Sequence, residues 1–248
     1  MQNSVDAQEV MVKKKMLMGL MALAVWWLSA GAVGARELKI QFDVFALGGG
    51  STLIDGQYFE DAGRAYHSRF EYAPKINVGV GVPFGNLLSI ETAYSYGPNN
   101  WVITDTTRTP RVPVVYPVRD YIGSLSAVFH SPVTFKGFRP YAAGGVDYIR
   151  FDPTPAAVAY AKNVGFAAVT TATINENSKL GINVGAGVEH KITKRLRLRI
   201  DVRDHVTSSP AFGLPPEPNE SNAVGFPVKG RAHNLEYTAG VVYHVGKL

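Results

Sequence analysis

The chain has 248 residues, a formal net charge of +5 and no cysteine. Without cysteine it can form no disulfide framework, thiolate metal site or lipoprotein lipobox, and it has no cysteine nucleophile. The 25 basic residues are dispersed along the sequence rather than clustered, which argues against a nucleic-acid-binding surface.

The first 35 residues have the pattern of an export signal. Three lysines at 13–15 precede a wholly apolar run at 16–28, and small residues follow up to Ala35. Basic, apolar and small segments in this order are typical of a Sec-type signal peptide. We expect cleavage of residues 1–35, which leaves 36–248 as the mature chain; a start at Met11 rather than Met1 would make the signal conventional. A retained transmembrane anchor is the alternative, because the apolar stretch is nearly long enough to span a bilayer.

The rest of the chain repeats an alternating pattern. In residues 75–82, four Ile and Val residues alternate with asparagine and glycine. Successive side chains of a strand point to opposite faces, so one face is apolar and the other small or polar. Eight such segments predict strands at 38–47, 76–82, 88–96, 121–130, 138–151, 180–191, 196–206 and 234–245.

The connections between these segments alternate in length. Short turns are predicted at 83–86, 131–137 and 193–195, and the Gly-Gly-Gly run at 48–50 is expected to end the first strand. Long segments lie at 51–73, 97–119, 152–178 and 207–233, and an alanine-rich stretch at 155–168 favours a short helix. An even strand number with short turns on one side and long loops on the other is typical of outer-membrane barrels.

The fold prediction is therefore an all-β, eight-stranded antiparallel up-and-down transmembrane β-barrel in the bacterial outer membrane, with short periplasmic turns and four long extracellular loops. Aromatic residues near the strand ends on the apolar face are expected to form two interfacial girdles: Tyr94, Tyr96, Tyr121, Tyr148, Phe151 and Tyr237 outside, and Phe84, Phe129, Phe138 and Tyr243 toward the periplasm. A soluble ligand carrier would need a bulky apolar interior, whereas the inner face here carries charges and glycines.

The last strand carries the most specific motif. Thr238, Gly240, Tyr243 and Val245 match the order polar, glycine, aromatic, hydrophobic of a barrel assembly signal, although Val245 stands where an aromatic residue is usual. With this motif, residues 38–245 resemble the eight-stranded outer-membrane barrel proteins, the group of the opacity proteins and the transmembrane domain of outer membrane protein A. The resemblance implies insertion by the barrel assembly machinery after export through the Sec translocon.

Charged residues on the inner face are the main candidate site. The lumen-facing positions by alternation, charged except for the amides Gln41 and Asn183, are Lys39, Gln41, Asp43, Glu91, Asp147, Asn183, Glu189, Arg197, Arg199, Asp201, Arg203, His205, Glu236 and His244. An eight-stranded barrel is only wide enough inside for side chains, so we expect a plug of salt bridges. The alternative is a narrow anion-preferring pore lined by the arginines of 196–206, with inward glycines leaving room for water.

Other activities have weaker support. Ser221-Asn222-Ala223 resembles the serine motif of lipid A deacylases, but Asn219 stands where their histidine is expected, and His205 with Ser208 or Ser209 is a second possible pair. We expect no enzyme activity, cofactor or metal site, because the six histidines are scattered. The expected partners are outer-membrane lipid, lipopolysaccharide and an unknown ligand of the loops, for which Tyr58, Phe59, Trp101 and Tyr116 are candidate contacts.

Overall fold

The computed structural model describes residues 41–61, 64–111, 113–164, 174–217 and 226–246, which belong to one compact unit. The predicted signal segment and Lys39 lie outside these residues. The elements in chain order are β1 (Phe42–Ile54), β2 (Gln57–Asp61), β3 (Arg64–Phe70), β4 (Tyr72–Phe84), β5 (Leu88–Asp105), β6 (Pro113–His130), β7 (Phe138–Pro153), α2 (Pro155–Val164), β8 (Asn177–Lys191), β9 (Leu196–Ser208) and β10 (Arg231–Val245).

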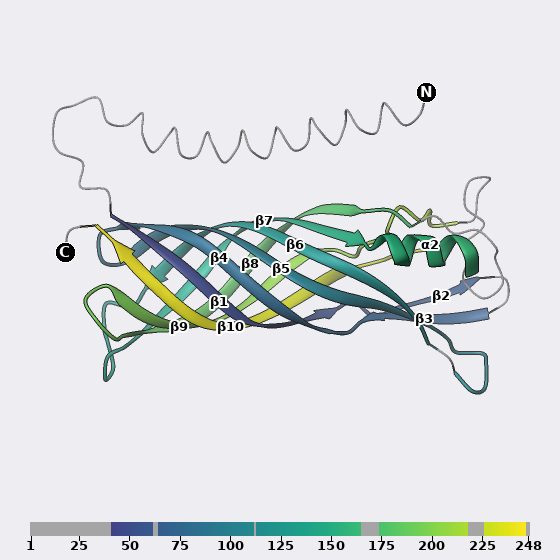
Figure 1. The fold of residues 1–248 in the computed structure, drawn as a ribbon, viewed down its shortest axis with the longest axis horizontal. Coiled ribbons are helices and arrows are strands. Elements are labelled where there is room, and N and C mark those ends of the chain that lie inside the picture. The colour runs from purple at the N-terminus through teal and green to yellow at the C-terminus, as the bar shows by residue number, and fades with distance from the viewer. Residues whose placement is uncertain (1–40, 62–63, 112, 165–173, 218–225, 247–248) are drawn as a thin grey trace, which may run out of the picture. The chain divides into compact units, whose positions relative to one another are not determined.

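Eight of these strands form a closed barrel (Figure 1). The sheet order is β5-β4-β1-β10-β9-β8-β7-β6, and β6 pairs back onto β5. Every pairing is antiparallel, and the first and last strands of the described chain lie side by side, from Phe42 opposite Val245 to Ile54 opposite His233. The predicted eight-stranded up-and-down barrel is therefore confirmed. No helix in the described part of the chain is both long and apolar enough to cross a bilayer.

Strand limits at the long-loop end differ from the prediction. The glycines at 48–50 do not end the first strand, because β1 continues through them in unbroken register with β4 and β10. The predicted loop 97–119 is mostly strand, since β5 and β6 stay paired out to Thr104 and Pro113. The valines, isoleucine and threonine of these segments are β-branched and favour strands, and they outweigh the prolines that suggested a loop.

The predicted loop 51–73 holds the hairpin β2–β3. Strand β3 pairs with the far end of β5, where β4 has already ended, so this side of the barrel extends beyond the eight-stranded part. In the third connection, helix α2 begins at Pro155, where the alanine-rich pattern predicted it. The hydroxyl of Thr154 accepts a hydrogen bond from the backbone N–H of Ala157 at 3.2 Å, which caps the helix.

The outer face of the barrel is apolar, as the alternation predicted. Exposed aliphatic side chains follow the middle of its strands: Val44, Ile76, Val78, Val80, Leu125, Val146, Ile182, Val184, Leu198, Ile200, Val202 and Val241. The girdle residues also point outward, with one exception. Phe151 is buried inside the barrel because it has the same parity as the inward-facing Asp147 and Ile149, so its assignment to the girdle was wrong.

The interior has two parts. Toward the short turns it is mainly polar and charged, whereas toward the long loops it is an aromatic cluster that includes Phe59, Trp101, Tyr116, Phe151, Phe212 and Phe226. The candidate loop contacts Phe59, Trp101 and Tyr116 are therefore buried in this cluster. Tyr58 is 77 % exposed and stacks on His67 with ring centroids 4.4 Å apart.

Glycines in the polar part make room for side chains from other strands. A Cβ atom at Gly79 would lie 2.3 Å from the ring of Phe45, and one at Gly187 would lie 2.1 Å from the hydroxyl of Tyr141. The space that the sequence suggested for water is therefore filled here by aromatic rings. Close packing of this kind tolerates no added methyl group without displacement.

Two isoleucines on the outer face test the depth of the apolar band. Ile200, in the middle of β9, and Ile54, at the end of β1, are 56 % and 57 % exposed. Ile54 lies opposite His233, which bonds to Asp204 at 2.8 Å on the outer surface, so it sits at the polar edge of the band. We expect Ile200→Lys to lower the free energy of unfolding in lipid vesicles by about 2–4 kcal/mol and Ile54→Lys by about 0–1 kcal/mol. An equal loss at both positions would contradict a lipid-facing band.

The glycine packing is tested by adding one methyl group. Gly187→Ala forces Tyr141 and the carbonyl of Ile200 to move, so we expect a loss of about 1–3 kcal/mol of stability. Gly123→Ala is the matched control, because the nearest atom to its added Cβ is 4.0 Å away. Urea titration followed by tryptophan fluorescence measures both; Trp101 is the one tryptophan of the mature chain if residues 1–35 are removed. Equal stability of the two variants would show that Gly187 is not needed for packing.

Candidate functional site

Strand β9 supplies most of the charged interior. Alternation along the strand turns Arg197, Arg199, Asp201, Arg203 and His205 inward, while Leu198, Ile200 and Val202 face outward. The register with β8 places Arg203 opposite Gly185, and the register with β10 places it opposite Glu236. A small residue beside a long arginine leaves the guanidinium free to reach across the lumen.

Arg199 is the centre of the network. Its side chain is 1 % exposed, and it donates two hydrogen bonds to the carboxylate of Glu91, at 2.8 and 2.9 Å. Its Nε donates to the hydroxyl of Tyr141 at 2.7 Å, and its guanidinium lies over the rings of Phe45 and Tyr141, 5.0 and 4.6 Å from their centroids. A buried charge is tolerated when it is paired and hydrogen-bonded in this way.

Asp201 joins two arginines of its own strand. Its carboxylate accepts hydrogen bonds from Arg203 at 3.1 and 3.2 Å and from Arg199 at 3.3 Å, and the Tyr141 hydroxyl donates to it as well. Arg203 also donates to the hydroxyl of Ser126 at 3.3 Å. Because Tyr141 accepts from Arg199 and donates to Asp201, it links the two ion pairs into one network.

Two carboxylates lie further toward the long loops. Asp147 accepts a hydrogen bond from Asn183 at 2.7 Å and pairs with Nδ1 of His205 at 2.9 Å. Glu236 accepts from Asn77 at 3.0 Å and from Ser95 at 2.7 Å, so amide and hydroxyl donors satisfy both of its oxygens.

The structure adds an ion pair that the sequence analysis missed. Lys75 Nζ lies 2.6 Å from Asp120 Oδ2, and both side chains are fully buried. Gly97 leaves space for the lysine, since a Cβ there would lie 2.7 Å from Lys75 Cδ. Extending the alternation one residue beyond Ile76 and Tyr121 would have pointed both charges inward.

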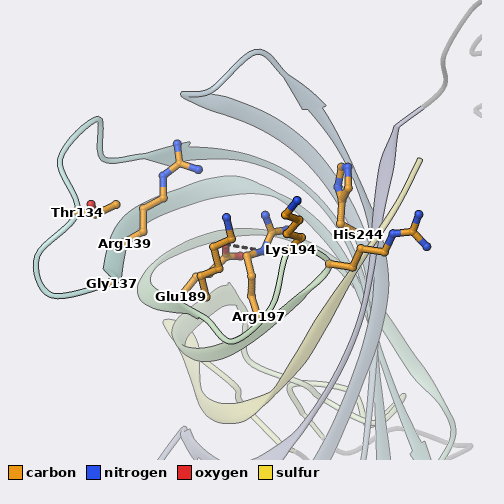
Figure 2. Close-up of a pocket in the computed structure, with 9 residues that line it drawn as sticks. Thr134, Gly137, Arg139, Glu189, Lys194, Arg197 and His244 are labelled. Atoms are coloured by element: carbon orange, nitrogen blue, oxygen red, sulfur yellow. Dashed lines mark ion pairs between the residues drawn. The ribbon is translucent and has the colours of Figure 1, made fainter. Parts of the chain in front are cut away.

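A cavity opens at the short-turn end of the lumen. Its volume is about 290 Å³, and its lining residues are Thr134, Gly137, Arg139, Glu189, Lys191, Lys194, Arg195, Arg197 and His244 (Figure 2). Asp43 lies behind this lining, where it pairs with Arg197 and its Oδ1 lies 2.8 Å from Nδ1 of His244. Arg197 Nε also lies 3.2 Å from Glu189 Oε2.

Aromatic rings fill the lumen at the long-loop end. Phe212 comes from the connection between β9 and β10 and is fully buried, with its ring centroid 4.6 Å from that of Trp101. The same connection is held to the β1–β2 loop by Ser209, which donates to Asp55 at 2.7 Å. Burial raises the pKa of the Asp55 carboxyl, and the hydrogen bonds from Gln57 and Ser209 oppose that shift.

The described residues form neither of the candidate serine–histidine pairs and no metal-ligand cluster. Ser221-Asn222-Ala223 lies outside the described residues, and His205 pairs with Asp147 while Ser209 bonds to Asp55. Within the residues that the structure describes, no group of three His, Asp or Glu side chains could hold a metal ion.

The assembly-signal residues lie in the strand that closes the barrel. Thr238 and Gly240 have the inward parity of β10, and Tyr243 faces outward. Val245 lies opposite Phe42 at the start of β1. The role of these four residues in insertion stays a prediction.

Comparison with known proteins identifies the fold. No protein-family model and no curated protein matches the sequence. Among solved structures, the outer membrane protein OprG from Pseudomonas aeruginosa is 12 % identical, with a TM-score of 0.52 over 84 % of this chain and 97 % of that one. Neisserial surface protein A is 15 % identical (TM-score 0.44; 82 % and 96 % covered), and Ail, the attachment invasion locus protein of Yersinia pestis, is 9 % identical (TM-score 0.45; 84 % and 100 % covered). The chain has the antiparallel β-barrel fold of outer-membrane proteins such as OprG.

Proposed function

We propose that the chain is an outer-membrane barrel with a closed lumen and a structural or surface-interaction role. The observation that carries the proposal is the pairing of Arg199 with Glu91, which lies across the lumen and is backed by Phe45 and Tyr141. Ion pairs and rings that are nearly inaccessible to solvent support a lumen that is closed at this level.

The aromatic cluster supplies a second barrier. Trp101, Phe151 and Phe212 are each at most 1 % exposed, and they lie between the charged network and the long-loop end. An ion that passed the network would then have to enter an apolar region, which is costly. Two barriers of different chemistry support a closed scaffold more strongly than either alone.

The surface role falls to the long-loop end. In the usual orientation of such barrels the short turns face the periplasm and the long connections face outward, with lipid and lipopolysaccharide around the strands. The β2–β3 hairpin then projects to the exterior, and Tyr58 is its exposed aromatic side chain. We take this hairpin as the candidate contact for a partner.

A small anion-preferring channel remains the second candidate. The observation that favours it is the basic lining of the cavity at the short-turn end, because charged rings at a pore mouth select ions of opposite sign.

Planar-bilayer recording separates these two functions. The refolded mature protein, inserted beside a porin as positive control, should show no stable conductance steps. Insertion is checked independently by protease protection of the barrel. Stable steps whose anion preference falls in Lys194→Gln/Arg195→Gln would overturn the closed scaffold and establish the channel; both residues are exposed, so the variant tests selectivity rather than folding.

Stability measurements test whether the network holds the barrel closed. Arg199→Met leaves Glu91 without the cation that donates its two hydrogen bonds, so we expect a loss of about 3–5 kcal/mol in the free energy of unfolding. The matched control is Arg231→Met, whose side chain is exposed and which should change stability by less than about 0.5 kcal/mol. A loss below about 1 kcal/mol for Arg199→Met would mean that the pair is not needed to close the lumen.

A further inference from the structure

The cavity at the short-turn end is built from several strands and turns. Thr134 and Gly137 come from the β6–β7 turn, Lys194 and Arg195 from the β8–β9 turn, and Arg197 and His244 from β9 and β10. Figure 2 shows Thr134, Lys194, Arg197 and His244 around the mouth of the barrel. The strand residues among them have the inward parity of their strands, so the cavity faces the lumen and not the lipid.

Positive charge is in excess in this cavity. Its lining contains five lysine and arginine side chains and one carboxylate, that of Glu189. Of these cations, Arg197 is engaged by Asp43 and Glu189. Arg139 donates instead to the backbone carbonyls of Ser131, at 3.1 Å, and of Asn86.

The other three cations have no acidic partner among the residues that the structure describes. Within the described part of the chain, no carboxylate lies within 4.0 Å of a charged nitrogen of Lys191, Lys194 or Arg195. Like charges held close together repel, and the repulsion is relieved when an anion binds between them. This arrangement differs from the rest of the lumen, where carboxylates pair with the buried arginines.

We propose that this cavity binds a soluble anion that carries several phosphate groups. Arginine recognises phosphate oxygens through its planar fork of donors, lysine supplies point charges, and Thr134 adds a neutral hydroxyl. A volume of about 290 Å³ corresponds to roughly ten water molecules at about 30 Å³ each, which suits a short polyphosphate chain.

The position of the cavity selects the source of the anion. Bilayer headgroups surround the outer face, whereas this lining faces inward, so the ligand comes from the aqueous compartment. The Arg199–Glu91 pair lies deeper in the lumen, so the anion is held at the mouth and does not pass through. The site is independent of the surface role proposed for the long-loop end.

Titration calorimetry with inorganic tripolyphosphate tests the proposal. The refolded protein in a zwitterionic detergent should bind it in a single saturable step, more tightly than it binds inorganic orthophosphate, and binding should weaken as salt rises. Absence of saturable binding at low salt, or equal affinity for orthophosphate, would overturn the proposal.

A pair of double variants separates a local site from overall charge. Lys194→Gln/Arg195→Gln removes two cations from the cavity and should weaken tripolyphosphate binding about tenfold or more. Lys229→Gln/Arg231→Gln removes the same charge from exposed residues at the long-loop end and should change the affinity less than about twofold. Equal weakening in both variants would show a delocalised charge effect and refute the site. Heat-modified mobility in gels checks that both variants fold.

A lipid arm separates a soluble anion from a headgroup. The same titration is repeated in bicelles that contain phosphatidylglycerol. Unchanged tripolyphosphate affinity supports a site for a soluble ligand. If phosphatidylglycerol lowers the tripolyphosphate affinity of the wild type but not that of Lys194→Gln/Arg195→Gln, headgroups occupy the cavity. That result would overturn the proposal of a soluble ligand.

Discussion

The narrowness of an eight-stranded barrel constrains everything inside this protein. There is room for side chains but not for the hydration shells that isolated charges need. Arg199 must therefore find its partners within the lumen, and it does so through Glu91, Tyr141 and Phe45 from three other strands. These contacts join β9 to β5, β7 and β1 across the barrel. The interactions that stabilise the buried charge of Arg199 therefore also hold strands on opposite sides of the barrel together.

The interior changes chemistry along its length. Charged pairs dominate near the short turns, and a cluster of aromatic rings fills the region where β5 and β6 extend beyond the other strands. The loop residue Phe212 completes this cluster, which removes the need for paired charges there. The basic cavity is the exception, because three of its cations, Lys191, Lys194 and Arg195, have no carboxylate partner among the residues that the structure describes.

The alternation of residue types made the inward-facing positions of the strands predictable from the sequence. A period of two fixes the facing of every strand residue, so the inward positions of Arg197, Arg199 and Arg203 follow from the sequence alone. The partners do not follow, because Arg199 and Glu91 are 108 residues apart and meet only after the barrel has closed. The extension of β5 and β6 was missed for a different reason: the prolines of this segment suggested a loop, whereas the two strands stay paired through it.

The pairing of β1 with β10 has a consequence for how the molecule forms. Asp43 and His244 meet across this seam although 201 residues separate them in the sequence. Contacts between such distant residues carry a large loop-closure entropy cost, and folds that depend on them are expected to form slowly. A chain without β10 would keep two open sheet edges, which pair readily with other chains. Closure of the barrel therefore depends on the fifteen residues of β10, Arg231–Val245, which pair with β1 on one side and β9 on the other.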